Sequence, residues 1–115
     1  MKRGEIWTIA DGPDYTSKPR PAVILQDERF DATDSLTICG ITTTYADSPL
    51  FRVPVIPDPQ NGLRMTGYIM ADKVTTVRRS KVGKRIGCLD DATLSQLSET
   101  VVLFLGLVMP RGRRK

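Results

Sequence analysis

Arg20 is the residue whose type and setting most clearly suggest chemistry, because it lies between Pro19 and Pro21. Two prolines restrict the backbone on both sides and fix the direction of the side chain. A guanidinium held in this way can place two N–H groups on a phosphate and stabilise the added charge of a pentavalent transition state. The alternative is an arginine tied to a nearby carboxylate that holds a loop, and spacing by itself favours that alternative.

Threonines and one aspartate end two other apolar segments. Thr42, Thr43 and Thr44 follow residues 38–41. A hydroxyl and a backbone N–H at a strand end can together hold a phosphate oxygen, although β-propensity alone also explains three threonines. Asp72 follows residues 67–71, where it could accept hydrogen bonds from a nucleobase or take a proton, or only cap the next turn.

Aromatic side chains available for stacking on exposed bases are few. Tyr15 and Tyr45 fall in predicted loops and are the better candidates, whereas Trp7 is expected in the core. The chain has no histidine, and Cys39 and Cys88 form no CxxC motif. These absences exclude a Ser-His-Asp triad, a Cys-His pair and a histidine-based zinc site. We expect no metal and no cofactor, and two buried thiols.

Charge is unevenly distributed, with a net charge of +4. The chain ends in a basic tail, and residues 73–88 carry six bases and no acid: Lys73, Arg78, Arg79, Lys81, Lys84 and Arg85. This pattern predicts one basic face and favours an anionic partner such as nucleic acid. A solvated surface strand with a frayed tail is the alternative.

The elements that must position these residues are mostly short strands. Alternating or β-branched segments predict strands at 5–9, 21–26, 36–44, 51–56, 67–72 and 84–89. The run at 22–25 is typical of a strand buried on both faces, and Pro54 places its strand at an edge or bulge. With 115 residues, we expect one domain, mainly β with a C-terminal helix: a small, strongly curved antiparallel sheet or barrel.

The predicted helix starts at Asp90 or Asp91 and ends near Gly106 and Pro110. One apolar stripe runs along it: Leu94, Leu97, Val101, Phe104 and Val108. Leu105 and Leu107 lie partly off this stripe. We expect them to be buried within the chain, with a dimer contact as the alternative. The longest apolar run, 101–109, is too short to span a bilayer, and no signal peptide precedes the first strand, so a cytoplasmic location without a membrane is expected.

Several segments in order resemble one protein family. They are Lys2-Arg3-Gly4-Glu5-Ile6-Trp7, Arg20-Pro21-Ala22-Val23-Ile24-Leu25, Ile38-Cys39-Gly40-Ile41-Thr42-Thr43 and Gly67-Tyr68-Ile69-Met70-Ala71-Asp72-Lys73-Val74. Their order and spacing resemble the MazF/PemK toxins of bacterial toxin–antitoxin systems over residues 2–108. The resemblance implies a dimeric, SH3-like barrel of the CcdB/PemK type over 1–109, followed by a basic tail at 110–115.

The resemblance also implies an activity and a site. The family's members are ribonucleases that cut single-stranded RNA such as mRNA at short sequences without metal. Their active-site arginine falls on Arg20, their threonine or serine on Thr42, and an aspartate of the PemK branch on Asp72. A second arginine of that branch is replaced here by Met70. We expect further RNA contacts from Tyr15, Lys18, Thr43, Thr44, Tyr45, Lys73, Arg78 and Arg79.

RNA carries its own nucleophile, the 2′-OH, so such an enzyme needs no serine or cysteine. Arg20 and Thr42 would hold the phosphate, and Asp72 is only a candidate for the base. The family implies a homodimer and a cognate antitoxin with a disordered acidic segment. Two alternatives remain: a CcdB-like toxin that poisons a protein such as DNA gyrase, and a degenerate toxin that keeps only antitoxin binding.

Overall fold

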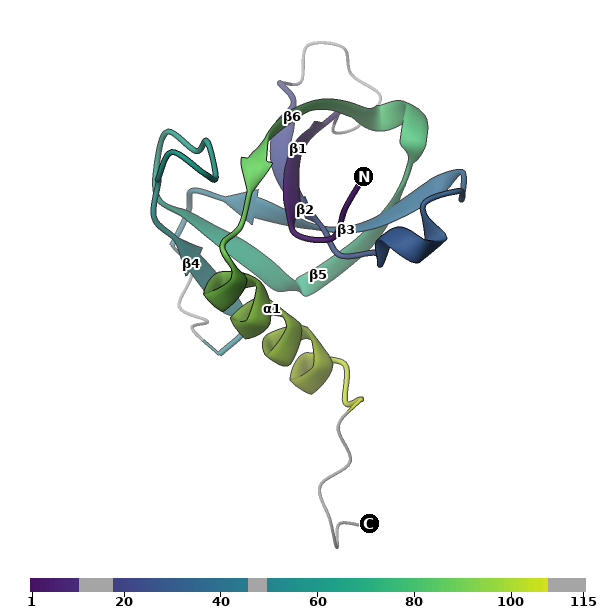
Figure 1. Cartoon of the computed structure of the whole chain (residues 1–115). Helices are drawn as coiled ribbons and strands as arrows, with labels where there is room; N and C mark the ends of the chain where they lie inside the picture. The colour runs from purple at the N-terminus through teal and green to yellow at the C-terminus, as the bar shows by residue number, and fades with distance from the viewer. Residues whose placement is uncertain (11–17, 46–49, 108–115) are drawn as a thin grey trace, which may run out of the picture.

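Six antiparallel strands form one curved sheet in a computed structural model that describes residues 1–10, 18–45 and 50–107 (Figure 1). The elements in chain order are β1 (Glu5–Ile9), β2 (Arg20–Ile24), the 3-10 turn η1 (Glu28–Phe30), β3 (Ser35–Thr42), β4 (Arg52–Val55), β5 (Gly67–Arg78), the 3-10 turn η2 (Arg79–Lys81), β6 (Val82–Cys88) and α1 (Asp91–Phe104). The predicted class, mainly β with a C-terminal helix, is confirmed.

The strand order in the sheet is β4-β5-β3-β2-β1-β6. β4 lies at one edge, as the proline at position 54 predicts, because an edge strand tolerates a residue without an N–H. β5 runs to residue 78, well beyond the predicted end at 72, and pairs with both β4 and β3. The sheet curls on itself, so that β6 comes round to lie beside β1 (Figure 1).

Each face of the sheet carries its own apolar cluster. Val23 and Leu25 belong to the cluster under the helix, whereas Ala22 and Ile24 belong to the cluster on the opposite face. Successive side chains of a strand point to opposite faces, so β2 contributes to both clusters. The prediction that residues 22–25 are buried on both faces is therefore confirmed.

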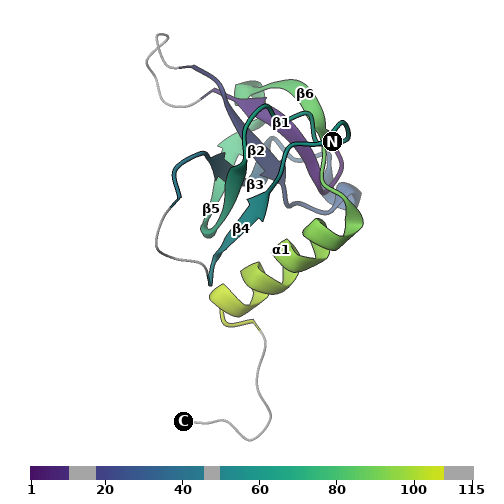
Figure 2. The ribbon, with the colours of Figure 1, turned by 90° about the vertical axis from the view of Figure 1, so that its left-hand side faces the viewer.

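Helix α1 packs against β4 and β5 and closes the first cluster (Figure 2). Its N-terminus is capped by Asp90, whose carboxylate accepts the backbone N–H of Thr93 at 2.7 Å. Hydrogen bonds from the side chain and the backbone of Thr93 lower the pKa of Asp90. Leu97 is fully buried. No helix in the described segments is long and apolar enough to cross a membrane.

The end of α1 differs from the expectation. Leu105 and Leu107 are 49% and 66% exposed, so the predicted burial of these side chains within the chain is wrong. The helix ends at Phe104 with Leu105 as its C-cap, and Gly106 adopts a φ of +70°, as is common after a helix C-terminus. Phe104 makes only a tilted contact with Phe51, with ring centroids 5.4 Å apart. Val108 lies outside the described residues.

Candidate active site

A groove of about 660 Å³ lies on the face of the sheet opposite the helix. Its floor is apolar, with Ile38 and Met70 among the residues that line it. Four cationic side chains also line it: Arg20, Lys73, Arg78 and Lys81. No acidic residue is among the described residues that line the groove. Such a surface suits a ligand with spaced negative charges and apolar parts between them.

A second, smaller space adjoins the groove, and we call it the side hollow. Its volume is about 210 Å³, and Leu63, Arg64 and Met65 form its far wall. Arg20 and Thr42 line both the groove and the side hollow. These two residues therefore stand at the junction of the two spaces.

Strand pairing explains how Arg20 and Thr42 meet. Arg20 begins β2, Thr42 ends β3, and the two strands are antiparallel, with Ala22 opposite Gly40. Continuing this register by two residues sets Arg20 opposite Thr42, where side chains of paired strands are close neighbours. The arginine is exposed and the threonine is half-buried, so the guanidinium reaches the groove from the strand's open end.

The Thr42 hydroxyl is already oriented by the backbone. Its Oγ1 accepts the backbone N–H of Thr44 at 3.1 Å. A hydroxyl has one hydrogen to donate, and this bond leaves that hydrogen available. The local turn therefore leaves the Thr42 hydroxyl able to donate a hydrogen bond to a ligand in the groove.

A β-bulge interrupts β5 beside this junction. The pairs Ile41–Ile69 and Cys39–Val74 are two residues apart on β3 but five residues apart on β5. β5 therefore has three extra residues between these pairs, which is an odd number. Side chains beyond the bulge consequently point to the opposite face from the one that strict alternation predicts.

The bulge changes which charged side chain lines the groove. Met70, before it, lines the groove, and alternation from Met70 would place Asp72 there too. Instead, Lys73 and then Thr75 line the groove, and Asp72 does not. The groove thus presents a cation where the sequence pattern predicts a carboxylate.

Asp72 is instead bound to Arg52 of β4. The Arg52 guanidinium donates to both carboxylate oxygens, at 2.9 and 3.2 Å, and the two side chains are only 13% and 14% exposed. The structure therefore does not bring Asp72 to Arg20 and Thr42, and gives it a partner that holds the edge strand. Cys39 lies nearby, and burial, with Asp72 adding to it, raises its pKa to about 12. Its thiol is thus buried and protonated, as the sequence suggested, while Cys88 is only half-buried.

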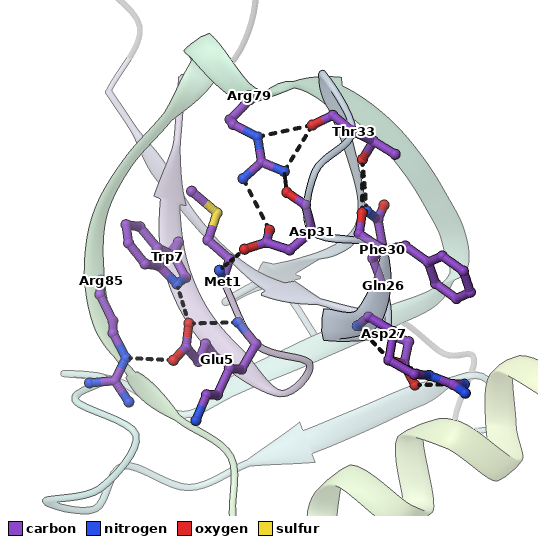
Figure 3. Close-up of polar contacts among 12 residues, drawn as sticks. Met1, Glu5, Trp7, Gln26, Asp27, Phe30, Asp31, Thr33, Arg79 and Arg85 are labelled. Carbon is purple, nitrogen blue, oxygen red and sulfur yellow. Dashed lines mark hydrogen bonds and ion pairs between the residues drawn. The ribbon is translucent and has the colours of Figure 1, made fainter.

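Arg79 does not line the groove, and its side chain is engaged with loop 31–33 (Figure 3). Its guanidinium donates to the carbonyl oxygen of Thr33, at 3.0 and 2.9 Å, to an Asp31 carboxylate oxygen at 3.1 Å and to the Asp31 carbonyl oxygen. The same Asp31 carboxylate accepts the N-terminal ammonium of Met1 at 2.7 Å, a contact that lowers the pKa of Asp31. Arg79 thus holds loop 31–33 and does not line the groove.

The six bases of residues 73–88 do not form one continuous face. Lys73, Arg78 and Lys81 line the groove. Arg85 pairs with Glu5 at 3.2 Å (Figure 3). Burial alone would raise the pKa of Glu5, but hydrogen bonds from Lys2 and Trp7, with the charge of Arg85, leave it below its usual value. Only three of these six bases line the groove, so the basic surface there is smaller than the sequence predicts.

The other residues expected to contact RNA are exposed where the structure describes them. Lys18, Thr43, Thr44 and Tyr45 are all exposed, and Thr43 lines the side hollow. The Tyr45 ring, 63% exposed, meets Tyr68 edge-on with centroids 5.4 Å apart. Tyr15 lies outside the described residues.

Comparison with known sequences decides the family. The family of PemK-like, MazF-like toxins of type II toxin–antitoxin systems matches residues 2–105. The chain belongs to this toxin family. The family match confirms the resemblance of the sequence segments. The junction of Arg20 and Thr42 is therefore a feature of a PemK/MazF toxin.

Named relatives cover nearly the whole length of this PemK/MazF chain. It is 44% identical over 107 residues to a probable endoribonuclease MazF of Mycolicibacterium smegmatis, covering 93% of this chain and 98% of the relative. The solved structure of Mycobacterium tuberculosis toxin MazF-mt6 is 27% identical with a TM-score of 0.76, covering 93% and 100%. An endoribonuclease from a mycobacterial species, solved in complex with its cognate antitoxin, is 25% identical with a TM-score of 0.74, covering 96% and 99%.

The far wall of the side hollow was missed by sequence reasoning. Arg64 is an isolated base in a segment without a strand or helix pattern, so no local signal distinguishes it. The described residues of this toxin also bring together no group of three or more histidine, cysteine, aspartate or glutamate side chains suited to a metal ion. The chemistry available at the junction is therefore that of a guanidinium, a hydroxyl and ammonium groups.

Proposed function

We propose that this PemK/MazF toxin is an endoribonuclease that cuts single-stranded RNA, including mRNA, at short sequences in the groove. The observation that carries the proposal is the meeting of Arg20 and Thr42 at the junction of two spaces, beside three further cations. A relative that is 44% identical and named a probable endoribonuclease MazF supports the same activity.

The reaction uses the nucleophile that RNA supplies. The 2′-oxygen attacks the adjacent phosphorus and loses its proton, the bond from phosphorus to the 5′-oxygen breaks, and that oxygen takes a proton. The products are a 2′,3′-cyclic phosphate and a 5′-OH. Arg20 offsets the charge that builds on the phosphorane oxygens, and the Thr42 hydroxyl donates to one of them. Positioning and electrostatics supply most of the rate, and no step needs a metal or a cofactor.

The groove also supports a regulatory partner. Its apolar floor and cationic lining fit an extended, acidic segment with apolar anchors, which is the chemistry expected of a disordered antitoxin tail. A relative has been solved with its cognate antitoxin. Because RNA and such a segment both present spaced negative charge, they compete for one surface. Cytoplasmic RNA is the substrate in this scheme.

A homodimer is part of the same proposal. Five large apolar side chains are exposed near the end of α1 and the approach to β4: Leu50, Leu103, Phe104, Leu105 and Leu107. Single exposed leucines are common, but a group of this kind marks an interaction surface. Covering it with a second copy would bury the helix end that this chain leaves exposed.

Incubation of the purified protein with a mixed RNA tests the activity. Sequencing of both fragment ends should find cuts at one short sequence, with 2′,3′-cyclic phosphates on one side and 5′-hydroxyls on the other. RNA with a 2′-deoxy nucleotide at the cut should stay intact. If no RNA is cut while DNA gyrase is inhibited, the protein is a CcdB-like poison instead. If neither occurs, it is a toxin that has lost its activity.

A further inference from the structure

The far wall of the side hollow follows a turn between β4 and β5 that several hydrogen bonds hold in place. Asn61 is the one buried polar residue among the residues that the structure describes, and it is 3% exposed. Its side-chain oxygen accepts the backbone N–H groups of Asp58 and Leu63, at 3.1 and 3.0 Å, and its amide donates to the Ile56 carbonyl at 2.9 Å. A satisfied buried amide of this kind makes the backbone around it rigid.

Strand β6 holds the same turn from the other side. The Cys88 N–H donates to the Gln60 carbonyl at 3.0 Å. Gly62 has a φ of +70°, and a Cβ there would lie 2.4 Å from the Ile86 carbonyl oxygen. A Cβ on Gly87 would likewise lie 2.4 Å from the Gln60 carbonyl oxygen. The turn therefore sits directly on β6, and residues 63–65 leave it in a defined direction.

That direction takes Leu63, Arg64 and Met65 into the side hollow. The Met65 side chain is 62% exposed, although it is apolar. The Arg64 guanidinium is exposed too, and no described residue engages it in a hydrogen bond or ion pair. Exposed methionine and arginine on a rigid support are typical of a binding surface.

The size and lining of the side hollow fit a single nucleobase. Its volume of about 210 Å³ is below the roughly 300–1,000 Å³ of pockets that take drug-sized ligands. Pro21, Ile41 and Leu63 offer apolar surface to the faces of a base. Arg64 offers the fork of donors that pairs with two acceptors on one base edge, as arginine does with guanine O6 and N7. The junction residues Arg20 and Thr42 are shared with the groove, so a base here is next to the cleaved phosphate.

We propose that the side hollow binds the base on one side of the cleaved bond and that Arg64 selects that base. This inference rests on the proposed ribonuclease activity. The groove holds the RNA on the other side of the junction. The recognition sequence of this toxin is thus decided in part by a turn that carries no catalytic group.

The test measures cleavage of short RNAs with random bases on both sides of the cut. In Arg64→Ala, the preference at one adjoining position should fall about five- to hundredfold, while the preference on the other side persists. Arg64→Lys keeps the charge but not the fork, and should lose the same preference. Lys84→Ala is the matched control, because Lys84 is exposed and lines neither space.

The outcomes separate this inference from the proposed function. If wild-type protein cuts no RNA, the ribonuclease proposal fails. If wild-type protein cuts but Arg64→Ala keeps the full preference, the side hollow does not select a base. If Arg64→Ala slows the cutting of every sequence equally, Arg64 binds a phosphate and the inference is also overturned.

Discussion

Asp72 and Arg52 form a bidentate ion pair that joins the edge strand β4 to β5, and neither residue lines the groove. Removing the guanidinium leaves a carboxylate with 14% exposure and no counter-charge. Arg52→Ala should therefore lower the free energy of unfolding by about 3 kcal/mol, measured by urea denaturation. The double variant Arg52→Met/Asp72→Leu, which removes both charges, should recover much of the loss.

The variant Asp72→Asn distinguishes a structural role of Asp72 from a catalytic one. Because Asp72 pairs with Arg52 and does not line the groove, we expect stability to fall and the cleavage rate of the remaining folded protein to persist. A variant of native stability that no longer cuts RNA would return Asp72 to the catalytic group.

Arg20 should be indispensable for cleavage. Loss of a group that stabilises transition-state charge costs on the order of 10²–10³ in rate, so Arg20→Ala should fall at least that far on a fluorogenic RNA. Arg20→Lys should recover little, because an ammonium lacks the planar fork. Arg29→Ala is the control: Arg29 is exposed and pairs only locally with Asp27. Full activity in Arg20→Ala would remove this residue from the mechanism.

The Thr42 hydroxyl is tested by two conservative changes. Thr42→Val keeps the branched shape but cannot donate, and should lower kcat/KM by about 100-fold. Thr42→Ser keeps the hydroxyl and the bond from the Thr44 N–H, and should stay close to wild type. Equal rates for the two variants would show that the hydroxyl contributes nothing.

Cleavage should continue in excess EDTA. The junction supplies cationic and hydroxyl groups, and the described residues bring no cluster of metal-binding side chains together. The measurement is the initial rate with and without chelator, after dialysis against EDTA. Loss of activity that Mg²⁺ restores would contradict the proposed reaction.

The antitoxin should compete with RNA, with an affinity that falls as salt rises. Arg78→Glu should weaken antitoxin binding, because Arg78 lines the groove and is exposed. Lys84→Glu is the matched control outside the groove. Arg79→Glu is unsuitable, since Arg79 holds loop 31–33 and its reversal should disturb the fold. A stable ternary complex of toxin, antitoxin and uncut RNA would show that the two do not overlap.

The sequence by itself determined features that depend on neighbours along the chain. Alternation placed residues 22–25 on both faces, a missing N–H placed Pro54 at an edge, and Asp90 capped the helix. The arginine at the start of β2 and the threonine at the end of β3 could also be expected to meet, because antiparallel pairing brings those two ends together.

Tertiary structure alone decided which charges face the groove. The bulge in β5 arises from pairing with a strand some thirty residues away, and it brings Lys73 into the groove lining, whereas Asp72 pairs with Arg52 and does not line the groove. Arg79 finds its partners 46 and 48 residues distant, and the side hollow forms only where the β4–β5 turn rests on β6. Local pattern cannot specify these contacts, because each is fixed by the register and packing of strands that are far apart in the chain.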